Sequence, residues 1–232
     1  MAAKPSPHPG LTGNQLKILA LVFMTADHVG LQLFPGVPFL RLVGRLAFPI
    51  YGWMIAEGCR YTRSRNRYFL RLAGLAAVCQ AAYFFAMGSL YQCVLVTFSL
   101  SLVLIWAIDR VKKQPNAGNF LLLSLLLGAA WLLTVTIPGK TATDFALDYG
   151  FWGVLLPVAV YLGRTKWEQL ALFAADLALL ALSLGGIQWW GLLALLPMAL
   201  YSGQRGKGKL GTLFYLYYPA HLLVIYGISL LL

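Results

Sequence analysis

Long hydrophobic runs recur along this chain, and they constrain its fold more than any other feature. From residue 16 onward the runs are about 15–22 residues long, and an α-helix needs roughly 20 apolar residues to cross a bilayer. The composition agrees, because 60% of the residues are hydrophobic and only 11% are charged, which is too few to cover a water-facing surface. The sequence therefore predicts an all-α, polytopic bundle of transmembrane helices.

We interpret nine runs as membrane spans, at residues 16–34, 39–59, 72–89, 93–109, 120–137, 150–162, 170–184, 188–201 and 212–232. The sixth to eighth runs are short, so these spans are expected to tilt, or the seventh and eighth to form a tight, partly re-entrant hairpin. Residues 14–232 are expected to form a single transmembrane domain after a disordered, Pro-rich tail at 1–13. No repeat of two inverted halves is visible, although such a repeat marks many transporters.

Positive charge alternates between successive connections of these spans. Every second connection, counting the N-terminal segment, holds one of five basic groups: Lys4 and Lys17; Arg60, Arg63, Arg65, Arg67 and Arg71; Arg110, Lys112 and Lys113; Arg164 and Lys166; Arg205, Lys207 and Lys209. The connections between them carry only Lys140. Because Lys and Arg gather on the cytoplasmic side, the N-terminus is predicted in the cytoplasm and Leu232 outside. The basic residues that give the chain its net charge of +11 are then expected to contact anionic lipid headgroups. The lack of a basic soluble face argues against nucleic-acid binding.

Ionisable side chains inside the runs are the candidates for function, because charges at membrane depth are costly. They are Asp27, His28, Arg41, Arg45, Glu57, Asp176 and His221. The alternative for any one of them is a purely structural contact that holds two helices together. The three cysteines are scattered and predict neither a disulfide framework nor a metal site.

Spacing predicts how two of these segments meet. Thr25, His28 and Gln32 share one face of a helix, whereas Asp27 lies about 100° away and is expected to face another helix. Arg41 and Arg45 are four residues apart and repel each other unless an anion lies between them. Asp27 can supply that anion, since the short turn at 35–38 makes the first two spans antiparallel neighbours.

The same reasoning covers the remaining polar positions. Pro49 removes the helical partner of the Arg45 carbonyl and is expected to kink the second span. Glu57, near its cytoplasmic end, is expected to pair with Arg60 or Arg63. Tyr217 and Tyr218 lie four and three residues before His221, so either hydroxyl can sit beside the imidazole. We expect Asp27, His28, Arg45 and His221 to surround one cavity.

Several short motifs follow one another along the chain. They are Lys17-Ile-Leu-Ala, Asp27-His28-Val-Gly30, Arg41, Gly44-Arg45-Leu-Ala-Phe48-Pro49-Ile, Ala56-Glu57-Gly58, Tyr61-Thr62, Tyr68, Arg71-Leu72, Asp148-Tyr149-Gly150, Gly153, Tyr215, Tyr218-Pro219 and His221-Leu222. Their ordered combination, over about residues 14–226, resembles the TraX family.

This resemblance implies an acyltransferase of the bacterial cytoplasmic (inner) membrane. Such an enzyme passes an acetyl group from cytoplasmic acetyl-coenzyme A to an acceptor within or across the bilayer. The family precedent for the acceptor is the N-terminus of a pilin; a small-molecule or glycan acceptor, and N- or O-acetylation, stay open. The embedded histidine on which the family's distant relatives rely matches His28.

The residues support roles in that chemistry. Neutral imidazole suits a general base near neutral pH, and His28 is favoured over His221 because it lies toward the outer half of its span. Arg45, Tyr218 or His221 can donate to the oxyanion, and Asp27 sets the local field.

The remaining predicted roles concern binding. The arginine-rich connection at 60–71 is expected to receive the phosphates of coenzyme A, with Arg60, Arg71, Glu57 and Tyr218 as cofactor-binding residues. Arg41 and Asp148 are expected to bind substrate, and no metal is expected.

Two other functions fit the same residues. A proton-coupled transporter or flippase would use Asp27, His28, Arg45 and His221 as a relay. A non-catalytic assembly factor for a pilus or secretion system would use them only to join helices. The arginines at 60–71 equally serve as topology determinants.

Overall fold

The computed structural model describes residues 10–138, 140–208 and 211–231, and all its named elements are helical. Five helical stretches are long and apolar enough to cross a membrane, judged by length and composition: Pro38–Tyr61, Arg65–Met87, Val94–Lys113, Ala117–Thr136 and Lys166–Leu184. The chain is therefore an all-α protein with membrane-type helices. The number of nine spans and the orientation stay predictions. Lys4, Lys209, Leu232 and most of the tail at 1–13 lie outside the described residues.

The chain packs into two compact units. The first comprises residues up to Met54 together with Ala181–Leu232, and the second comprises Ile55–Leu180. Helix α3 (Ala47–Tyr61) and helix α8 (Lys166–Leu184) contribute to both. Each unit is described by itself below.

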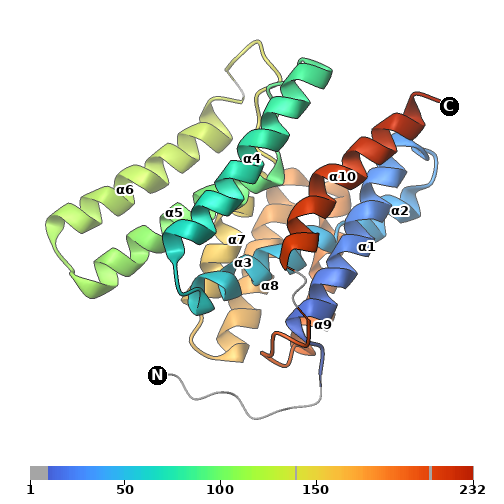
Figure 1. The fold of residues 1–232 in the computed structure, drawn as a ribbon. Helices are drawn as coiled ribbons and strands as arrows, with labels where there is room; N and C mark the ends of the chain where they lie inside the picture. Colours follow the sequence, from blue (N-terminus) through green and yellow to red (C-terminus); the bar gives the residue numbers. More distant parts are fainter. Residues whose placement is uncertain (1–9, 139, 209–210, 232) are drawn as a thin grey trace. The chain divides into compact units, whose positions relative to one another are not determined.

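The first unit is built around two helices that run side by side in the same direction, α1 (Gly13–Gln32) and α10 (Gly211–Ser229) (Figure 1). A capping box between Thr12 and Gln15 starts α1. The same end is tied to the connection before α10, because the Gly13 N–H donates to the Gln204 carbonyl at 2.7 Å. The Asn14 Nδ2 also donates to the Lys207 carbonyl at 2.8 Å. Both helices therefore begin at one end of the unit.

Helix α2 (Pro38–Gly44) packs closely against α1 and continues, after a short break, into α3. A Cβ on Gly30 would lie 2.7 Å from the Leu40 Cβ, so the two backbones approach more closely than larger residues permit. The break at residues 45–46 precedes Pro49 by one turn, where proline cannot supply the N–H that the Arg45 carbonyl needs. The helix is therefore interrupted where the sequence predicts a kink. The unit also contains the 3₁₀ helix η2 (Gly186–Ala194) and the short helix α9 (Leu195–Ala199).

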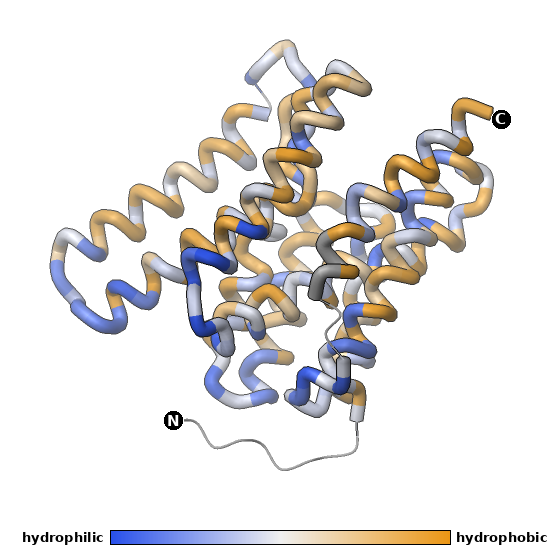
Figure 2. Tube along the Cα trace, viewed as in Figure 1, coloured by the Kyte–Doolittle hydropathy of each residue, from blue (hydrophilic) through white to orange (hydrophobic). Residues whose placement is uncertain are grey.

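In the second unit, α5 (Val94–Lys113) packs against three neighbours: α4 (Arg65–Met87), α6 (Ala117–Trp131) and α7 (Gly150–Leu162). Leu102 and Ile105 of α5 and Val154 of α7 are fully buried, and the Ser101 hydroxyl donates to the Val154 carbonyl at 2.7 Å. A π-helical turn, η1 (Leu132–Thr136), extends α6. The middle parts of the helices are mostly apolar, whereas the α5–α6 and α3–α4 connections and the adjoining helix ends are polar (Figure 2).

The connections of the second unit gather at two opposite ends. At one end Arg65 pairs with Asp109 at 2.5 Å, and Arg60 donates to the Val160 carbonyl at 2.7 Å. At the other end the Gln92 N–H donates to the Ala146 carbonyl at 2.7 Å. The basic connections thus meet at one end and the connections with few charges at the other.

Candidate active site

Two histidines from distant parts of the sequence meet in the first unit. The His28 Nδ1 of α1 lies 2.8 Å from the His221 Nε2 of α10, a hydrogen-bonding distance. His221 is only 6% exposed, and His28 is partly exposed. The second nitrogen of His221, Nδ1, lies 2.8 Å from the Tyr217 carbonyl oxygen. The predicted proximity of the two imidazoles is therefore present.

Aromatic and hydroxyl groups hold this pair in place. The Tyr217 ring stacks on the His221 imidazole, with centroids 5.2 Å apart and planes 12° apart, and Tyr218 meets it edge-on. The Tyr217 hydroxyl lies 2.7 Å from the Thr25 Oγ1, which donates to the Leu21 carbonyl at 2.8 Å. Thr25 lies one turn before His28 and Tyr217 one turn before His221, so the contact joins α1 and α10 beside the pair.

Asp27 collects both arginines of the second span. Its Oδ2 accepts a hydrogen bond from the Arg41 Nη1 at 2.9 Å and one from the Arg45 Nη2. The Asp27 and Arg45 side chains are 11% and 8% exposed, whereas the Arg41 side chain is 25% exposed. The predicted anion between the two cations is present, and it brings Arg41, expected to bind substrate, into the same cluster as Arg45. Both guanidinium groups are near enough to His28 for a coulombic interaction.

Apolar side chains surround these polar groups. Leu21, Met24 and Ala47 form a buried cluster, and Tyr51 and Phe23 pack against it with Tyr217 and Tyr218. His221, which is 6% exposed, is therefore largely shielded from water. In such a setting a hydrogen bond or a charge acts more strongly than in water.

Three predicted cofactor-binding residues lie in the second unit, and two of them have structural partners. The Arg60 guanidinium donates to the carbonyls of Tyr161 and Gly163 at 3.1 and 2.8 Å, besides that of Val160, and so closes the C-terminal end of α7. Glu57 pairs with Arg60 at 3.2 Å, as predicted. Arg71 is exposed on α4.

Asp148, expected to bind substrate, also lies in the second unit. It accepts a hydrogen bond from the Tyr91 hydroxyl at 2.9 Å, and its carbonyl accepts one from Thr97 at 2.7 Å. Burial and the neighbouring Asp148 carboxylate raise the pKa of Tyr91, so its hydroxyl stays protonated and donates. Tyr149, which follows, has a φ of 63° and precedes α7.

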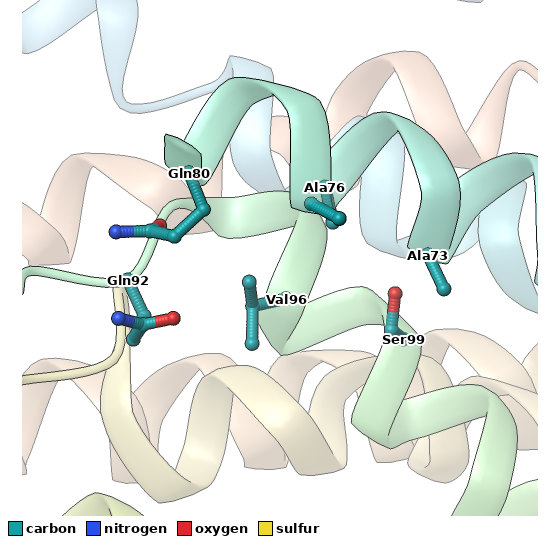
Figure 3. A pocket seen from close by; sticks show the side chains of 7 residues that line it. Ala73, Ala76, Gln80, Gln92, Val96 and Ser99 are labelled. Carbon is teal, nitrogen blue, oxygen red and sulfur yellow. The ribbon is translucent and has the colours of Figure 1, made fainter. Parts of the chain in front are cut away.

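A groove of about 260 Å³ runs between α4 and α5 in the second unit. Figure 3 shows Ala73, Ala76 and Ser99 along its apolar part and Gln80 and Gln92 at one end. Gln80 is engaged there, because its amide donates to the Tyr91 carbonyl at 2.7 Å and accepts from the Cys93 N–H at 3.1 Å. The groove holds no charged group in its lining and contains none of the predicted site residues.

Sequence reasoning missed one cluster and left one residue without a role. The missed cluster joins Arg65, Asp109 and Tyr161, whose hydroxyl donates to Asp109 at 2.7 Å. Asp109 ends a hydrophobic run next to basic residues, which is the pattern of an ordinary interfacial charge. Asp176 of α8 is 5% exposed, and its Oδ2 has no hydrogen-bond partner among the described residues. Those residues also contain no cluster of three or more His, Cys, Asp or Glu that could hold a metal.

Comparison with protein families matches residues 12–229 to the family described as TraX protein. The chain is 25% identical over 248 residues to the probable fimbrial assembly protein FimC, serogroup H1, of Dichelobacter nodosus, with 91% of this chain and 93% of that protein covered. It is 47% identical over 36 residues to the uncharacterized protein RP591 of Rickettsia prowazekii (strain Madrid E), 16% of this chain and 14% of that protein. No solved structure matches the chain.

Proposed function

The chain belongs to the TraX family, and from this premise and its pair of contacting histidines we propose that it is an integral membrane acyltransferase. It transfers an acetyl group from acetyl-coenzyme A to an amine or a hydroxyl of an acceptor. The observation that carries the proposal is the 2.8 Å contact between His28 and His221 next to the Asp27–arginine cluster. A membrane-embedded imidazole is costly to maintain and marks a site of proton transfer.

The reaction requires a base that removes a proton from the acceptor and then delivers it to the leaving thiolate. His28 takes the proton of the acceptor's N–H or O–H as the acceptor atom bonds to the acetyl carbonyl carbon. The C–S bond of the thioester then breaks, and the coenzyme A thiolate receives the proton from His28 and leaves as a thiol. The acetylated acceptor and free coenzyme A are the products, and the histidine returns to its neutral form.

The developing oxyanion needs hydrogen-bond donors in a dry site. Arg41 and Arg45 are fixed by Asp27 at a coulombic distance from His28. A positive field held in place before the reaction stabilises negative charge on the carbonyl oxygen without further rearrangement. Arg45 is assigned this role because its side chain is the more buried of the two, at 8% against 25% exposed.

The donor's phosphates are assigned to the basic connection that precedes α4 and to the first turns of that helix. Arg60 is engaged at the end of α7 and Arg65 by Asp109, so Arg67 and Arg71 are the proposed phosphate contacts. These two residues are exposed and lie four residues apart on α4, where an anion between them removes their mutual repulsion.

The acceptor is proposed from the relative named as a fimbrial assembly protein. A pilus subunit is the acceptor that this name favours, with its N-terminal amine as the acetylated group. A small-molecule or glycan acceptor is the alternative within the same reaction. The protein is placed in the bacterial cytoplasmic membrane with the N-terminus inside, so that acetyl-coenzyme A arrives from the cytoplasm.

The match to a fimbrial assembly protein also supports one function that is not enzymatic. A protein that assists fimbrial assembly without catalysis would use the Asp27–arginine cluster and the histidine pair only to hold α1, α2 and α10 together. Such a protein would release no thiol from acetyl-coenzyme A.

The test is turnover by the purified protein in lipid nanodiscs. Acetyl-coenzyme A is added with n-octylamine or n-octanol as a membrane-soluble acceptor, and both thiol release and the acetylated product are measured. His28→Gln should lower the rate by about 10²–10⁴-fold, the usual contribution of a general base, with little change in donor binding. The chain's third histidine offers a control, since His8→Gln should retain the wild-type rate. Folded wild-type protein that releases no thiol from acetyl-coenzyme A with either acceptor, or with a peptide that carries the N-terminus of a pilus subunit, would favour the assembly role.

A further inference from the structure

The donor and the acceptor of each hydrogen bond around the histidine pair can be assigned, starting from the Tyr217 carbonyl. The Tyr217 carbonyl oxygen can only accept, so the His221 Nδ1 that lies 2.8 Å from it must carry the hydrogen. Within the described residues the partners of His221 are His28, Tyr217 and Tyr218, and none of them is an anion. An imidazolium at 6% exposure without an anionic partner is costly, so His221 is neutral and has one hydrogen only.

The remaining steps follow from the number of hydrogens on a neutral imidazole. With its hydrogen on Nδ1, His221 offers a lone pair at Nε2. The His28 Nδ1 lies 2.8 Å from that lone pair and must therefore be the donor. Neutral His28 then has its own lone pair at Nε2, on the side of the ring that faces away from His221.

We propose that His28 and His221 form a dyad in which the His28 Nε2 is the base and His221 is the residue that positions it. This inference rests on the proposed acetyl transfer and adds the atom that performs it. When the acceptor's proton reaches the His28 Nε2, the positive charge of the imidazolium is shared with the hydrogen bond from His28 Nδ1 to the His221 Nε2. A histidine base is commonly held by a carboxylate or carbonyl at its other nitrogen; here a second histidine, itself held by a carbonyl, does so.

A second hydrogen-bond chain fixes the ring that covers His221. Thr25 uses its single hydroxyl hydrogen on the Leu21 carbonyl, so the Tyr217 hydroxyl donates to the Thr25 Oγ1. The Tyr217 ring is held in this way parallel to the His221 imidazole. His221 is thus restrained in its plane by two hydrogen bonds and across its face by an aromatic ring.

This assignment changes the role expected for His221 from the sequence. A donor to the acetyl carbonyl or to coenzyme A needs a free N–H, whereas the only N–H of neutral His221 is used on Tyr217. The dyad therefore removes His221 from direct contact with the substrates. It leaves oxyanion stabilisation to Arg45 and Tyr218.

The tautomer is measured without reference to activity. Protein labelled with ¹⁵N-histidine is studied by NMR in nanodiscs, and the His28 signals are assigned by their loss in His28→Gln. The hydrogen of neutral His28 should lie on Nδ1, and this preference should disappear in His221→Phe. A His28 hydrogen found on Nε2 overturns the dyad, whatever the protein's activity.

Kinetics separate a positioning residue from a substrate-binding one. His221→Phe should lower kcat by about 10–100-fold, the usual loss when the partner of a functional histidine is removed, with the KM for acetyl-coenzyme A unchanged. His221→Gln should recover part of this loss, because its carbonyl oxygen can still accept from the His28 Nδ1. Tyr217→Phe keeps the backbone carbonyl and the ring, so it should cost less than His221→Phe.

Two results would count against the dyad in these measurements. One is a rise in the KM for acetyl-coenzyme A in both His221 variants with kcat unchanged, which would make His221 a donor-binding residue. The other is a His221→Phe loss as large as that of His28→Gln, with no recovery in His221→Gln. A wild-type protein without turnover would count against the proposed function instead, and the NMR tautomer would still decide on the hydrogen-bond chain.

Discussion

At the scale of single residues, Asp27 organises the charges next to the histidine pair. One of its carboxylate oxygens, Oδ2, receives both Arg41 and Arg45, and a Cβ on Gly44 would lie 2.7 Å from the Asp27 Cα. The carboxylate is therefore fixed against α2 by packing as well as by charge. A buried ion pair contributes little net stability, but breaking it on one side leaves an uncompensated charge.

We expect Asp27→Asn to lower the free energy of unfolding by about 3–5 kcal/mol, because it removes the carboxylate that pairs with the buried Arg45 guanidinium. Arg45→Ala should also lower it, because the Asp27 carboxylate then keeps only the more exposed Arg41. Arg41→Ala should cost less, since the Arg41 side chain is 25% exposed and the Arg45 side chain 8%. Unfolding of the purified variants in detergent, followed by circular dichroism, measures the order of their free energies of unfolding.

Asp176→Asn is the matched control for this prediction. Asp176 is as buried as Asp27, but its Oδ2 has no hydrogen-bond partner among the described residues, so the substitution removes no ion pair. It should leave stability within about 1 kcal/mol of the wild type. A cost for Asp176→Asn that equals the cost for Asp27→Asn would show that burial alone, without the arginines, sets the effect.

A second residue-scale prediction concerns Asp144, which lies outside the helices. The hydroxyl of Ser89 and the N–H of Leu90 donate to its carboxylate, and these hydrogen bonds lower the pKa of Asp144. Because the pKa is lower in the folded state, the stabilisation is present above the unfolded-state pKa of about 3.9 and is lost as pH falls through the folded-state pKa.

Ser89→Ala should therefore lower the melting temperature at pH 7 and have a smaller effect at pH 2, because the stabilisation is lost as pH falls through the folded-state pKa of Asp144. Melting curves at the two pH values test this. Thr143→Ala is a control in the same connection, because the Thr143 hydroxyl donates to Thr141 and not to Asp144. An equal effect of Ser89→Ala at both pH values would mean that the carboxylate's charge does not strengthen the contact.

At the scale of elements, hydropathy located the apolar parts of the helices and missed their polar first turns. The third predicted span, 72–89, lies largely within α4, which begins at Arg65 because the Ser64 side chain accepts a hydrogen bond from the Arg67 N–H. The seventh, 170–184, lies within α8, which begins at Lys166. A capped turn of arginines or lysines is helical without being apolar, so a hydropathy scan does not include it.

Glycine at the α1–α2 contact allows a prediction for this pair of elements. Gly44→Ala would place a methyl group against Asp27, so the helices must separate or the carboxylate must move. We expect a loss of about 1–3 kcal/mol in the free energy of unfolding, as is usual for overpacking, together with weaker pairing of Asp27 with Arg45. Chemical denaturation and the acetyl-transfer rate should both report the change.

Gly74→Ala serves as the control, because Gly74 lies within α4 and a Cβ there meets nothing within 4 Å. Alanine is the better helix former, so this variant should be unchanged or more stable by up to about 1 kcal/mol. Equal stability of the two variants would contradict close packing of α1 on α2.

At the scale of the whole chain, the sequence was sufficient to predict the fold class and the pairing of charges within the candidate site. It was not sufficient to predict the hydrogen-bond partners of individual side chains. Runs of apolar residues indicate helices, and the i, i+4 spacing of Arg41 and Arg45 indicated the need for an anion, which Asp27 supplies. The three carbonyls that Arg60 contacts could not be predicted, because they belong to a helix about a hundred residues away. The donor and acceptor roles of His28 and His221 likewise depend on interatomic distances, which the spacing of residues in the sequence does not give.

The charge pattern of the connections makes a prediction for the complete chain. Within the second unit, the connections predicted to share a side of the membrane do lie at the same end of the helices: Arg65 reaches Asp109, and Leu90 reaches Asp144. Within the first unit, the start of α1 is bonded to the basic connection at 204–208. This grouping is what an alternating set of spans requires, and the positive residues predict that the basic ends lie on the cytoplasmic side.

Single cysteines introduced into a variant without Cys59, Cys79 and Cys93 should therefore label from opposite sides. Cysteine in place of Arg63, Lys112, Arg164 or Lys207 should react only after the cytoplasmic side is opened, and cysteine in place of Lys140 or Leu232 should react in intact cells with a reagent that does not cross the membrane. The Lys140 and Lys112 variants control for each other, since the described structure places α6 and η1 between their connections and one helix reverses the side. Reaction of the Arg63 variant in intact cells would overturn the orientation. It would also rule out Arg67 and Arg71 as the proposed phosphate-binding residues, because the proposed reaction draws acetyl-coenzyme A from the cytoplasm.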